Sequence, residues 1–305
     1  MMVVEEDKQK GTSPHQRGSG YPGRCPRRPP PRRRQQKTAA SVLVASREGL
    51  QAFREYGDSW YLSVKELESR FHPQEPLARQ PQVTAEGRCK LVGWLIPLNR
   101  YFSLSFETLC KAINILDRFL VTTPVAIDCF QLLGLTALFI ASKQVEVQPP
   151  TIGDLLARCR GAFTRQQLRN LECIVLRRLN FDLVVPTISF FLEYFNLVRL
   201  ETPQADAREA ADAQSLAVGI AELSLADYAF INYAPSLLAA GSLGLADRLL
   251  QHRRPVDLKV SGYPEEILQD CMAQLRLLVS LNEDSLSTLL PLEVARKCLW
   301  QLDSR

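Results

Sequence analysis

The stretch DCFQLLGLTALFIASK, which runs from Asp128 to Lys143, decides the fold of this chain. Within it, apolar side chains fall on nearly every side of a helix. A helix that is hydrophobic all round is buried all round. We therefore predict a central helix here, with the other helices of its unit packed about it.

Helical spacing of apolar residues continues on both sides of this stretch, without a sustained alternation typical of strands. Several helix starts carry a capping Ser or Thr, in one case with Gln three residues later. The expected helices of this first unit are 84–98, 105–120, 128–143, a short one opening at Thr151, and 165–179. An amphipathic segment from about Leu50 to Phe71 precedes them.

A second series of helical segments follows Pro186. Its expected helices are 187–199, 206–227, 235–250, 264–281 and 285–300. We therefore predict an all-α protein made of two consecutive five-helix domains. The predicted parts are a tail at 1–48, an N-terminal helix and linker at 49–79, a first domain at 80–185 and a second domain at 186–303.

The net charge of +4 takes its sign from one end of the chain. Residues 1–48 carry 11 Lys and Arg against 4 Asp and Glu, a net charge of +7, which leaves 26 against 29, or −3, for residues 49–305. The tail is also rich in Pro and Arg and poor in apolar residues, so we predict that it is disordered. Such a basic cluster can serve as a nuclear-import signal or contact nucleic acid, although a solvated linker is its commoner role.

The eight cysteines are scattered, without the paired spacing of metal ligands, and only three histidines occur. This pattern is typical of a protein in a reducing compartment. No apolar run approaches the roughly 18 residues that a membrane span needs, and no signal peptide opens the chain. We therefore expect a soluble cytoplasmic protein, which the basic tail can also direct to the nucleus, with no metal, cofactor or membrane partner.

Two charged residues lie where apolar residues are expected. Glu172 projects between Leu168 and Val175 on the apolar stripe of its helix, and Arg88 is in register with the apolar stripe of the helix that follows Thr84. An ionised group in such a place needs a partner. For Glu172, either the chain supplies an internal cation, or the stripe is partly an interface with another molecule.

Five short segments occur in the order and spacing of a cyclin box. They are RCKLVGWL at 88–95, LDRFL at 116–120, LLG at 132–134, ASK at 141–143 and LE at 171–172. The chain strongly resembles the cyclin family from about Leu50 to Leu299. The resemblance implies that both five-helix domains have the cyclin fold. It also implies that the residues marking the box are Arg88, Asp117, Leu132, Lys143 and Glu172.

The resemblance gives these residues two roles. In cyclins the first two pair inside the box, so it assigns Arg88 and Asp117 to the architecture, and the loss of one partner of such a pair is costly. Lys143 and Glu172 would bind the backbone of a cyclin-dependent kinase. The implied protein is a regulatory subunit that binds and activates this kinase and is not itself an enzyme. Neutralisation of Glu172 by Lys143 within the chain is the rival explanation.

Several segments resemble one branch of the cyclin family in particular. Among them are 129–134, 143–147, 186–193 and 221–228. That branch is associated with the amplification of centrioles and the differentiation of multiciliated cells. The resemblance therefore implies this process rather than a mitotic checkpoint.

Many cyclins hold an Arg-x-Leu peptide of their substrates on the first helix of the box. The residues that match this docking patch are Leu91, Trp94 and Gln131. The residues that depart from it are Gly87, Lys90 and Pro97, which stand where a methionine, an isoleucine and a glutamate are usual. We expect weak or altered docking, because apolar area is lost and Lys90 would repel the arginine of the peptide.

Two other classes of function fit the sequence less well. A cyclin-fold transcription factor needs a basic surface for DNA, whereas residues 49–305 sum to −3, so we expect no nucleic-acid partner for the folded core. The segment FHPQEPL at 71–77 is loosely similar to a motif of uracil-DNA glycosylases. Those enzymes need a water-activating acid and a base-flipping pocket in an α/β fold, and this segment lies between predicted helices.

Two further patterns have a structural interpretation. Four aromatic residues at helical spacing predict core of the second unit: Phe190, Phe191, Tyr194 and Phe195. The sequences LDRFL at 116–120 and ADRLL at 246–250 are similar. They fall in the second and the third helix of their units, so we predict no shared role for them.

Overall fold

The computed structural model describes residues 47–203 and 205–298, and within them every regular element is helical. The predicted all-α fold with two consecutive helical units is confirmed. The apolar side chains form two separate clusters, one in each unit. The predicted tail at 1–48 lies outside the described residues, apart from its last two, which begin a helix.

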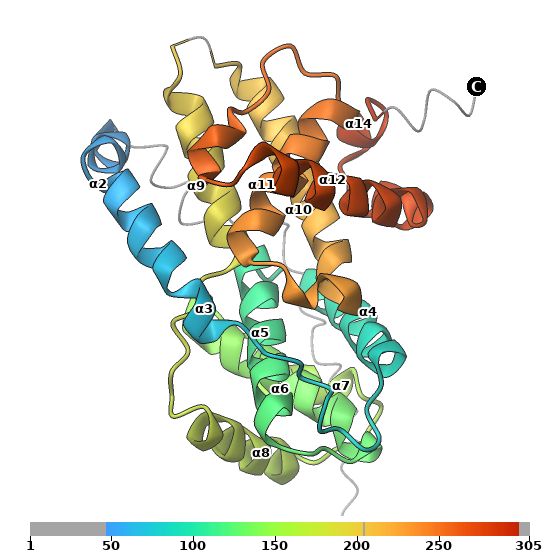
Figure 1. Ribbon diagram of the computed structural model, residues 1–305. Coiled ribbons are helices and arrows are strands. Elements are labelled where there is room, and N and C mark those ends of the chain that lie inside the picture. The colour runs from blue at the N-terminus through green and yellow to red at the C-terminus, as the bar shows by residue number, and fades with distance from the viewer. Residues whose placement is uncertain (1–46, 204, 299–305) are drawn as a thin grey trace, which may run out of the picture. The chain divides into compact units, whose positions relative to one another are not determined.

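The first unit is built about its third helix, as predicted. The helices are α4 (Ala85–Tyr101), α5 (Phe106–Thr122), α6 (Ile127–Val145), α7 (Ile152–Ala157) and α8 (Arg165–Arg178). Helix α6 is buried along most of its length and contacts the other four (Figure 1). Three of the predicted caps are present, because the side chains of Thr84, Ser105 and Thr164 each accept a backbone N–H of the first turn. A cap predicted at Thr123 is wrong, because α6 begins after Ala126 and Thr123 ends α5.

The second unit begins with four long helices. They are α9 (Ile188–Glu201), α10 (Ala207–Ala226), α11 (Pro235–Leu249) and α12 (Glu265–Ser280), with short 3₁₀ turns η1 (Tyr228–Asn232) and η2 (Leu258–Ser261) between them. The single final helix predicted at 285–300 is wrong. The chain forms α13 (Glu283–Leu289) and α14 (Leu292–Ala295) instead. Pro291 separates them, because proline lacks the N–H and clashes with the preceding helical turn.

The aromatic residues of α9 form part of the second core, as predicted. Phe191, Tyr194 and Phe195 are buried, and Phe190 packs against the same cluster. The ring of Tyr61 stacks on the ring of Tyr194, with 4.5 Å between ring centroids.

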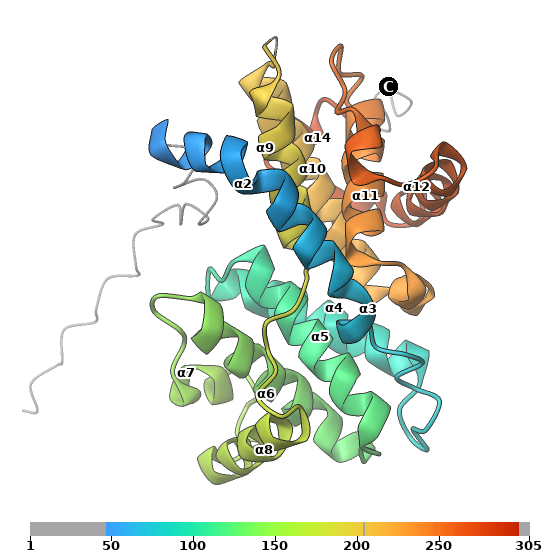
Figure 2. The ribbon, with the colours of Figure 1, turned by 60° about the vertical axis from the view of Figure 1, so that its left-hand side comes forward.

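Tyr61 belongs to the N-terminal helix, which is attached to the second unit. The predicted segment 50–71 is two helices, α2 (Arg47–Glu66) and α3 (Glu68–Phe71), interrupted at Leu67. Helix α2 packs against α9, beside it in Figure 1 and crossing it obliquely in Figure 2. The Tyr61 hydroxyl donates to the carbonyl oxygen of Ser261 at 2.8 Å, and Lys65 donates to the same oxygen. The helix is therefore held by polar contacts as well as by aromatic packing.

Glu68 caps a helix that is distant in the sequence. Helix α11 begins after Ala234, whose side chain cannot accept a hydrogen bond. The backbone N–H and the hydroxyl of Ser236 donate instead to the two carboxylate oxygens of Glu68, at 2.6 and 2.7 Å. A carboxylate at a helix N-terminus is favoured by the helix dipole. The start of α11 therefore depends on α3.

Two carboxylates meet where α5 of the first unit contacts α9 of the second. Glu107 accepts a hydrogen bond from the Thr187 hydroxyl at 2.5 Å. The distance from Lys111 Nζ to Glu107 Oε1 is 3.5 Å. Burial, and then the charge of Glu107, raise the pKa of Glu193 to about 7. The folded chain therefore retains a proton on Glu193 at pH values where an ordinary glutamate has lost it.

This pKa shift predicts a pH dependence of stability. Between the ordinary pKa of 4.5 and about 7, the folded state holds a proton that the unfolded state releases, so stability falls as pH rises. Between about pH 5 and pH 8, wild type should lose up to about 3 kcal/mol more unfolding free energy than Glu193→Gln. Urea unfolding at a series of pH values measures this difference. Glu266→Gln, on the exposed face of α12, is the control, and a Glu193→Gln curve parallel to wild type would contradict the shift.

Candidate functional site

Lys143 and Glu172 lie side by side on the surface of the first unit. Lys143 occupies the last turn of α6 and Glu172 the middle of α8, and Lys143 Nζ forms an ion pair with Glu172 Oε1. The Lys143 side chain is 40% exposed and the Glu172 side chain 12%. Lys143 is thus the internal cation that was one of the two possible partners of Glu172, and it remains accessible to solvent.

The helices place these two charges for identifiable reasons. A lysine in the last turn of α6 is favoured by the helix dipole, and Lys143 Nζ also lies 4.5 Å from the centre of the Phe139 ring. Helix α8 turns Leu168 and Val175 into the core. Glu172 lies between these two in the sequence and faces the edge of the core, where the ammonium group meets it.

Large apolar side chains are exposed in the segment that follows α8. The Gln144 side chain donates to the Leu183 carbonyl at 3.1 Å, which holds the segment after α8 against the last turn of α6. In that segment Phe181 is 66% exposed and Val184 73% exposed. Exposed apolar groups near polar ones are typical of a protein–protein interface. Sequence reasoning missed both residues, although bulky apolar residues in a loop are a signal.

The structure also brings Arg88 of α4 and Asp117 of α5 together. Arg88 Nε and Nη2 donate to the two carboxylate oxygens of Asp117, both at 2.7 Å, and each side chain is 3% exposed. The remaining terminal nitrogen donates to the Leu225 carbonyl at the end of α10, at 3.1 Å. Leu132 is buried in the first core. These three residues therefore lie inside the fold and are not available to a partner.

The second unit contains a comparable pair. Arg199 of α9 donates to Asp247 of α11 at 2.7 Å, and Asp247 also accepts the backbone N–H of Val256 at 2.8 Å. The expectation of no shared role for the sequences at 116–120 and 246–250 is wrong. In each unit the aspartate of this sequence binds a buried arginine from the unit's first helix. Asp117 lies on the second helix of its unit and Asp247 on the third. The order of the helices in the sequence therefore gave no sign that the two aspartates have the same role.

The three residues of the predicted docking patch line one shallow hollow. Its volume is about 230 Å³, and its lining comprises Lys90, Leu91, Trp94, Ile127, Phe130 and Gln131. Lys90 Nζ pairs with Glu86 at 2.6 Å on the exposed face of α4. Gly93 faces open space. An apolar hollow is therefore present, with a cation at its edge.

Residues 47–203 and 205–298 are the part of the chain that the structure describes. In that part of the chain no three side chains among His, Cys, Asp and Glu are grouped to hold a metal ion, and the seven cysteines there are free thiols. None of its helices combines the length and the apolar character required to cross a membrane. The segment 71–77 ends α3 and forms the connection to α4.

Comparison with known proteins gives two family matches that together span most of the chain. The family model "Cyclin, N-terminal domain" matches residues 59–184, and "Cyclin, C-terminal domain" matches residues 186–290. Cyclin-O of Homo sapiens is 63% identical over 249 residues, which cover 82% of this chain and 71% of that protein. Cyclin-O protein B of Xenopus laevis is 53% identical over 254 residues, 82% of this chain and 70% of that protein.

A solved structure has the same fold. The viral cyclin from herpesvirus saimiri matches with a TM-score of 0.65 at 21% identity, over 72% of this chain and 96% of that one.

The buried Arg88–Asp117 pair predicts a large effect on stability. Asp117→Asn leaves the guanidinium without a counter-charge in the interior, so the free energy of unfolding should fall by about 3 to 5 kcal/mol. Urea denaturation measures it. Glu86→Gln breaks an ion pair on the exposed face of the same helix and should cause no measurable loss. If the two variants lost similar stability, Arg88 would not depend on Asp117.

Proposed function

The chain belongs to the cyclin family, and on that premise we propose that it binds a cyclin-dependent kinase and stabilises the active conformation of that kinase. Cyclins are regulatory subunits rather than enzymes. The observation that carries the proposal is the accessible Lys143–Glu172 pair, together with the exposed Phe181 and Val184 in the segment after α8. Lys143 and Glu172 are the positions to which the resemblance assigns kinase contact.

The chemistry of the pair suits recognition of a main chain. An ammonium group donates to carbonyl oxygens and a carboxylate accepts from amide N–H groups. Hydrogen bonds of this kind, in which one partner is charged, are stronger than neutral ones. When a partner covers Phe181 and Val184, water is excluded and the local dielectric falls, which strengthens the bonds further.

Pairing within the chain does not compete with this role. Lysine has three N–H donors, and a carboxylate has about four acceptor sites. The contact between Lys143 Nζ and Glu172 Oε1 uses one donor and one acceptor. The remaining donors and acceptors can bind a partner while the pair persists. The internal contact therefore holds two flexible side chains in place before binding, which lowers the entropy lost on association.

The proposed mechanism is allosteric. Phosphoryl transfer by a protein kinase requires an ion pair between a lysine and the glutamate of one mobile helix. A subunit that binds the active arrangement more tightly than the inactive one shifts the kinase towards activity. The cyclin contributes binding energy at Lys143, Glu172 and the apolar residues of the segment after α8, and no reacting group.

We propose that substrate docking at the hollow beside Trp94 is weaker than in cyclins that bind Arg-x-Leu peptides. The hollow retains Leu91, Trp94 and Gln131. Lys90 stands at its edge, with its charge only partly offset by the exposed Glu86, and would oppose an arginine of the peptide.

We also propose that the chain acts in the amplification of centrioles and the differentiation of multiciliated cells. The support is the sequence similarity to Cyclin-O over most of the chain. The activity would take place in the cytoplasm, with nuclear entry through the basic residues of the tail.

An exchange of the two charges separates kinase binding from internal neutralisation. In Lys143→Glu/Glu172→Lys the two groups can still pair with each other, so melting temperature and helical content should stay unchanged. The exchanged groups present an acceptor where a donor is needed, so recovery of kinase should fall at least tenfold. The amount of kinase that co-purifies with the chain from ciliating cells is measured, and the kinase is identified by mass spectrometry. Centrioles are counted in the same cells.

The matched control for this experiment is Glu86→Lys/Lys90→Glu. It exchanges the charges of another surface pair on the same unit and should leave kinase recovery at the wild-type level. If the Lys143→Glu/Glu172→Lys variant recovered as much kinase as wild type, the two residues would only neutralise each other and would not bind the kinase. Normal centriole numbers despite lost kinase binding would contradict the role in centriole amplification.

Direct titration with an Arg-x-Leu peptide tests the docking hollow. Wild type should bind weakly, and Gly87→Met/Lys90→Ile should bind at least about tenfold more tightly, because two apolar side chains are regained and a repulsive charge is removed. Calorimetry or fluorescence anisotropy measures both affinities. Gly93→Ala, which adds a methyl group in open space on α4, is the control. Tight binding by wild type would show that Gly87 and Lys90 do not weaken docking.

A further inference from the structure

An open pocket of about 670 Å³ lies where α3, the end of α5 and the end of α8 meet. The described residues of its lining include one arginine from each of these helices: Arg70, Arg118 and Arg178. Among the same residues, Asp182 supplies the only carboxylate. Burial lowers the pKa of His72, which also lines the pocket, so its ring is neutral at pH 7. The lining therefore carries three positive charges against one negative charge.

Two of the arginines are held against the same aromatic ring. The guanidinium carbons of Arg70 and Arg118 lie 5.2 and 4.9 Å from the centre of the buried Phe71 ring, a position that favours cations. Asp182 binds both of them. Its carboxylate accepts a hydrogen bond from Arg70 at 2.6 Å, and its backbone carbonyl accepts one from Arg118 at 2.9 Å. The two guanidinium groups are therefore placed before any ligand binds.

Most of the donors of the three arginines remain available. A guanidinium group has five N–H donors. Arg70 and Arg118 each give one to Asp182, and Arg178 Nε gives one to the Thr123 hydroxyl at 3.1 Å. Within the described part of the chain no further acceptor binds them. Each arginine can therefore donate to another molecule without losing its contact in the fold.

The fold alone does not explain why three cations share this pocket. Arg70 and Arg178 lie in the last turns of α3 and α8, where the helix dipole favours a positive charge. Arg118 lies outside the last turn of α5, so this explanation does not reach it. Burial lowers the pKa of Arg118 and the charge of Arg70 lowers it further, against the opposing effect of Asp182. An anion in the pocket would relieve this repulsion.

We propose that the pocket binds the phosphate group of a phosphorylated serine or threonine in a protein segment. Such a group carries a charge of about −1.5 to −2 and three strong acceptor oxygens. These match three separate guanidinium groups and a lining charge of about +2. A carboxylate has one charge and two oxygens, which a single bidentate arginine satisfies.

The shape of the pocket favours a protein segment as the source of the phosphate. The volume of about 670 Å³ leaves room beside the phosphate, and Val121 and the exposed Phe181 add apolar surface to the wall. Neighbouring side chains of a peptide can contact that surface. Single-stranded nucleic acid is instead held by an extended basic groove, whereas residues 49–305 have a net charge of −3.

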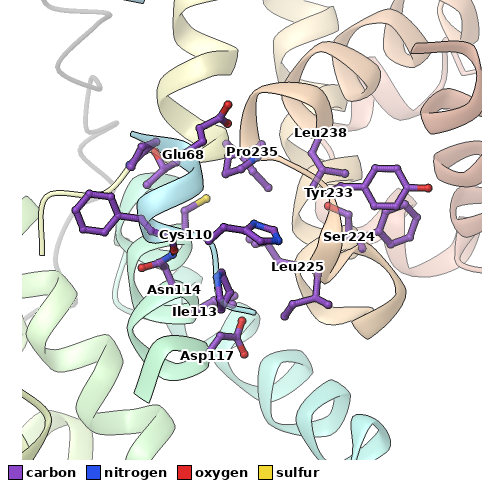
Figure 3. Close-up of a pocket in the computed structure, with 18 of the residues that line it drawn as sticks. Glu68, Cys110, Ile113, Asn114, Asp117, Ser224, Leu225, Tyr233, Pro235 and Leu238 are labelled. Carbon is purple, nitrogen blue, oxygen red and sulfur yellow. The ribbon is translucent and has the colours of Figure 1, made fainter. Parts of the chain in front are cut away.

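Phosphate binding would fasten α3 to the first unit. This short helix is already held to the second unit, because Glu68 accepts hydrogen bonds from Ser236; Figure 3 shows Glu68 near Pro235, the first residue of α11. A phosphate bound by Arg70, Arg118 and Arg178 would add a contact to α5 and α8. The proposal does not depend on kinase binding, so the purified chain can test it separately.

The first test compares three labelled peptides on the purified full chain by fluorescence anisotropy. They share the sequence Ala-Leu-X-Leu-Ala, in which X is phosphoserine, glutamate or serine. The phosphopeptide should bind saturably and about tenfold more tightly than the glutamate peptide, because it carries more charge and a third oxygen. The serine peptide should show no measurable binding. Equal affinities of the phosphopeptide and the glutamate peptide, or no binding of the phosphopeptide, would overturn the proposal.

Competition identifies the source of the phosphate. Inorganic phosphate should displace the phosphopeptide only at about tenfold higher concentration, because it makes no contact with Val121 and Phe181. Displacement by inorganic phosphate at equal concentration would make this a site for free phosphate and would overturn the peptide assignment. A single-stranded oligonucleotide that bound more tightly than the phosphopeptide would overturn it in favour of nucleic acid.

Variants with a matched control locate the site. Arg178→Gln should weaken phosphopeptide binding about tenfold, because a charge-assisted hydrogen bond is lost, and Arg70→Gln/Arg178→Gln should abolish it. Arg177→Gln removes the same charge from the adjacent exposed position of α8, outside the pocket lining, and should stay within about twofold of wild type. Equal losses in Arg177→Gln and Arg178→Gln would show that net charge alone attracts the peptide. The comparison of the peptides on wild type stands even if a variant fails to fold.

Discussion

The buried guanidinium of Arg88 is the constraint on which the arrangement of both units depends. A charge in the interior needs acceptors for its N–H groups in the absence of water. Asp117 provides two on α5, and the Leu225 carbonyl provides another at the end of α10. Helix α4 is therefore fixed against its own unit and against the next one by a single side chain. A second arginine of α4, Arg100, binds Glu222 of α10 and the carbonyl of Leu289.

The Lys143–Glu172 pair differs in exposure from the two buried ion pairs. Arg88 with Asp117, and Arg199 with Asp247, are almost fully buried and leave no room for a partner. Lys143 and Glu172 form a pair of the same chemistry at the surface, and the segment after α8 carries apolar side chains that nothing within the described chain covers. The burial of the first two pairs is a requirement of folding. The exposure of the Lys143–Glu172 pair leaves its hydrogen-bonding capacity free for another molecule.

The sequence predicted those features that depend on local patterns. The all-round apolarity of α6 implied its central position, and Thr84, Ser105 and Thr164 marked helix starts through their capping side chains. The prediction of a single helix at 285–300 was wrong because the helical spacing of apolar residues continues across Pro291, which ends the helix. Contacts that depend on the angle between helices were beyond sequence reasoning. Examples are the capping of α11 by Glu68 and the pairing of Arg199 with Asp247.

The attachment of α2 and α3 to the second unit has a consequence for synthesis of the chain. Tyr61 binds Ser261, 200 residues later, and Glu68 binds Ser236, 168 residues later. Contacts between such distant segments form slowly and only after the later segment exists. On the ribosome, α2 must therefore wait for α9 and for Ser261 before Tyr61 has its packing partner and its hydrogen-bond acceptor. During that interval its exposed apolar surface is a target for chaperones and for aggregation, so α2 becomes secure only after the chain has been made as far as Ser261.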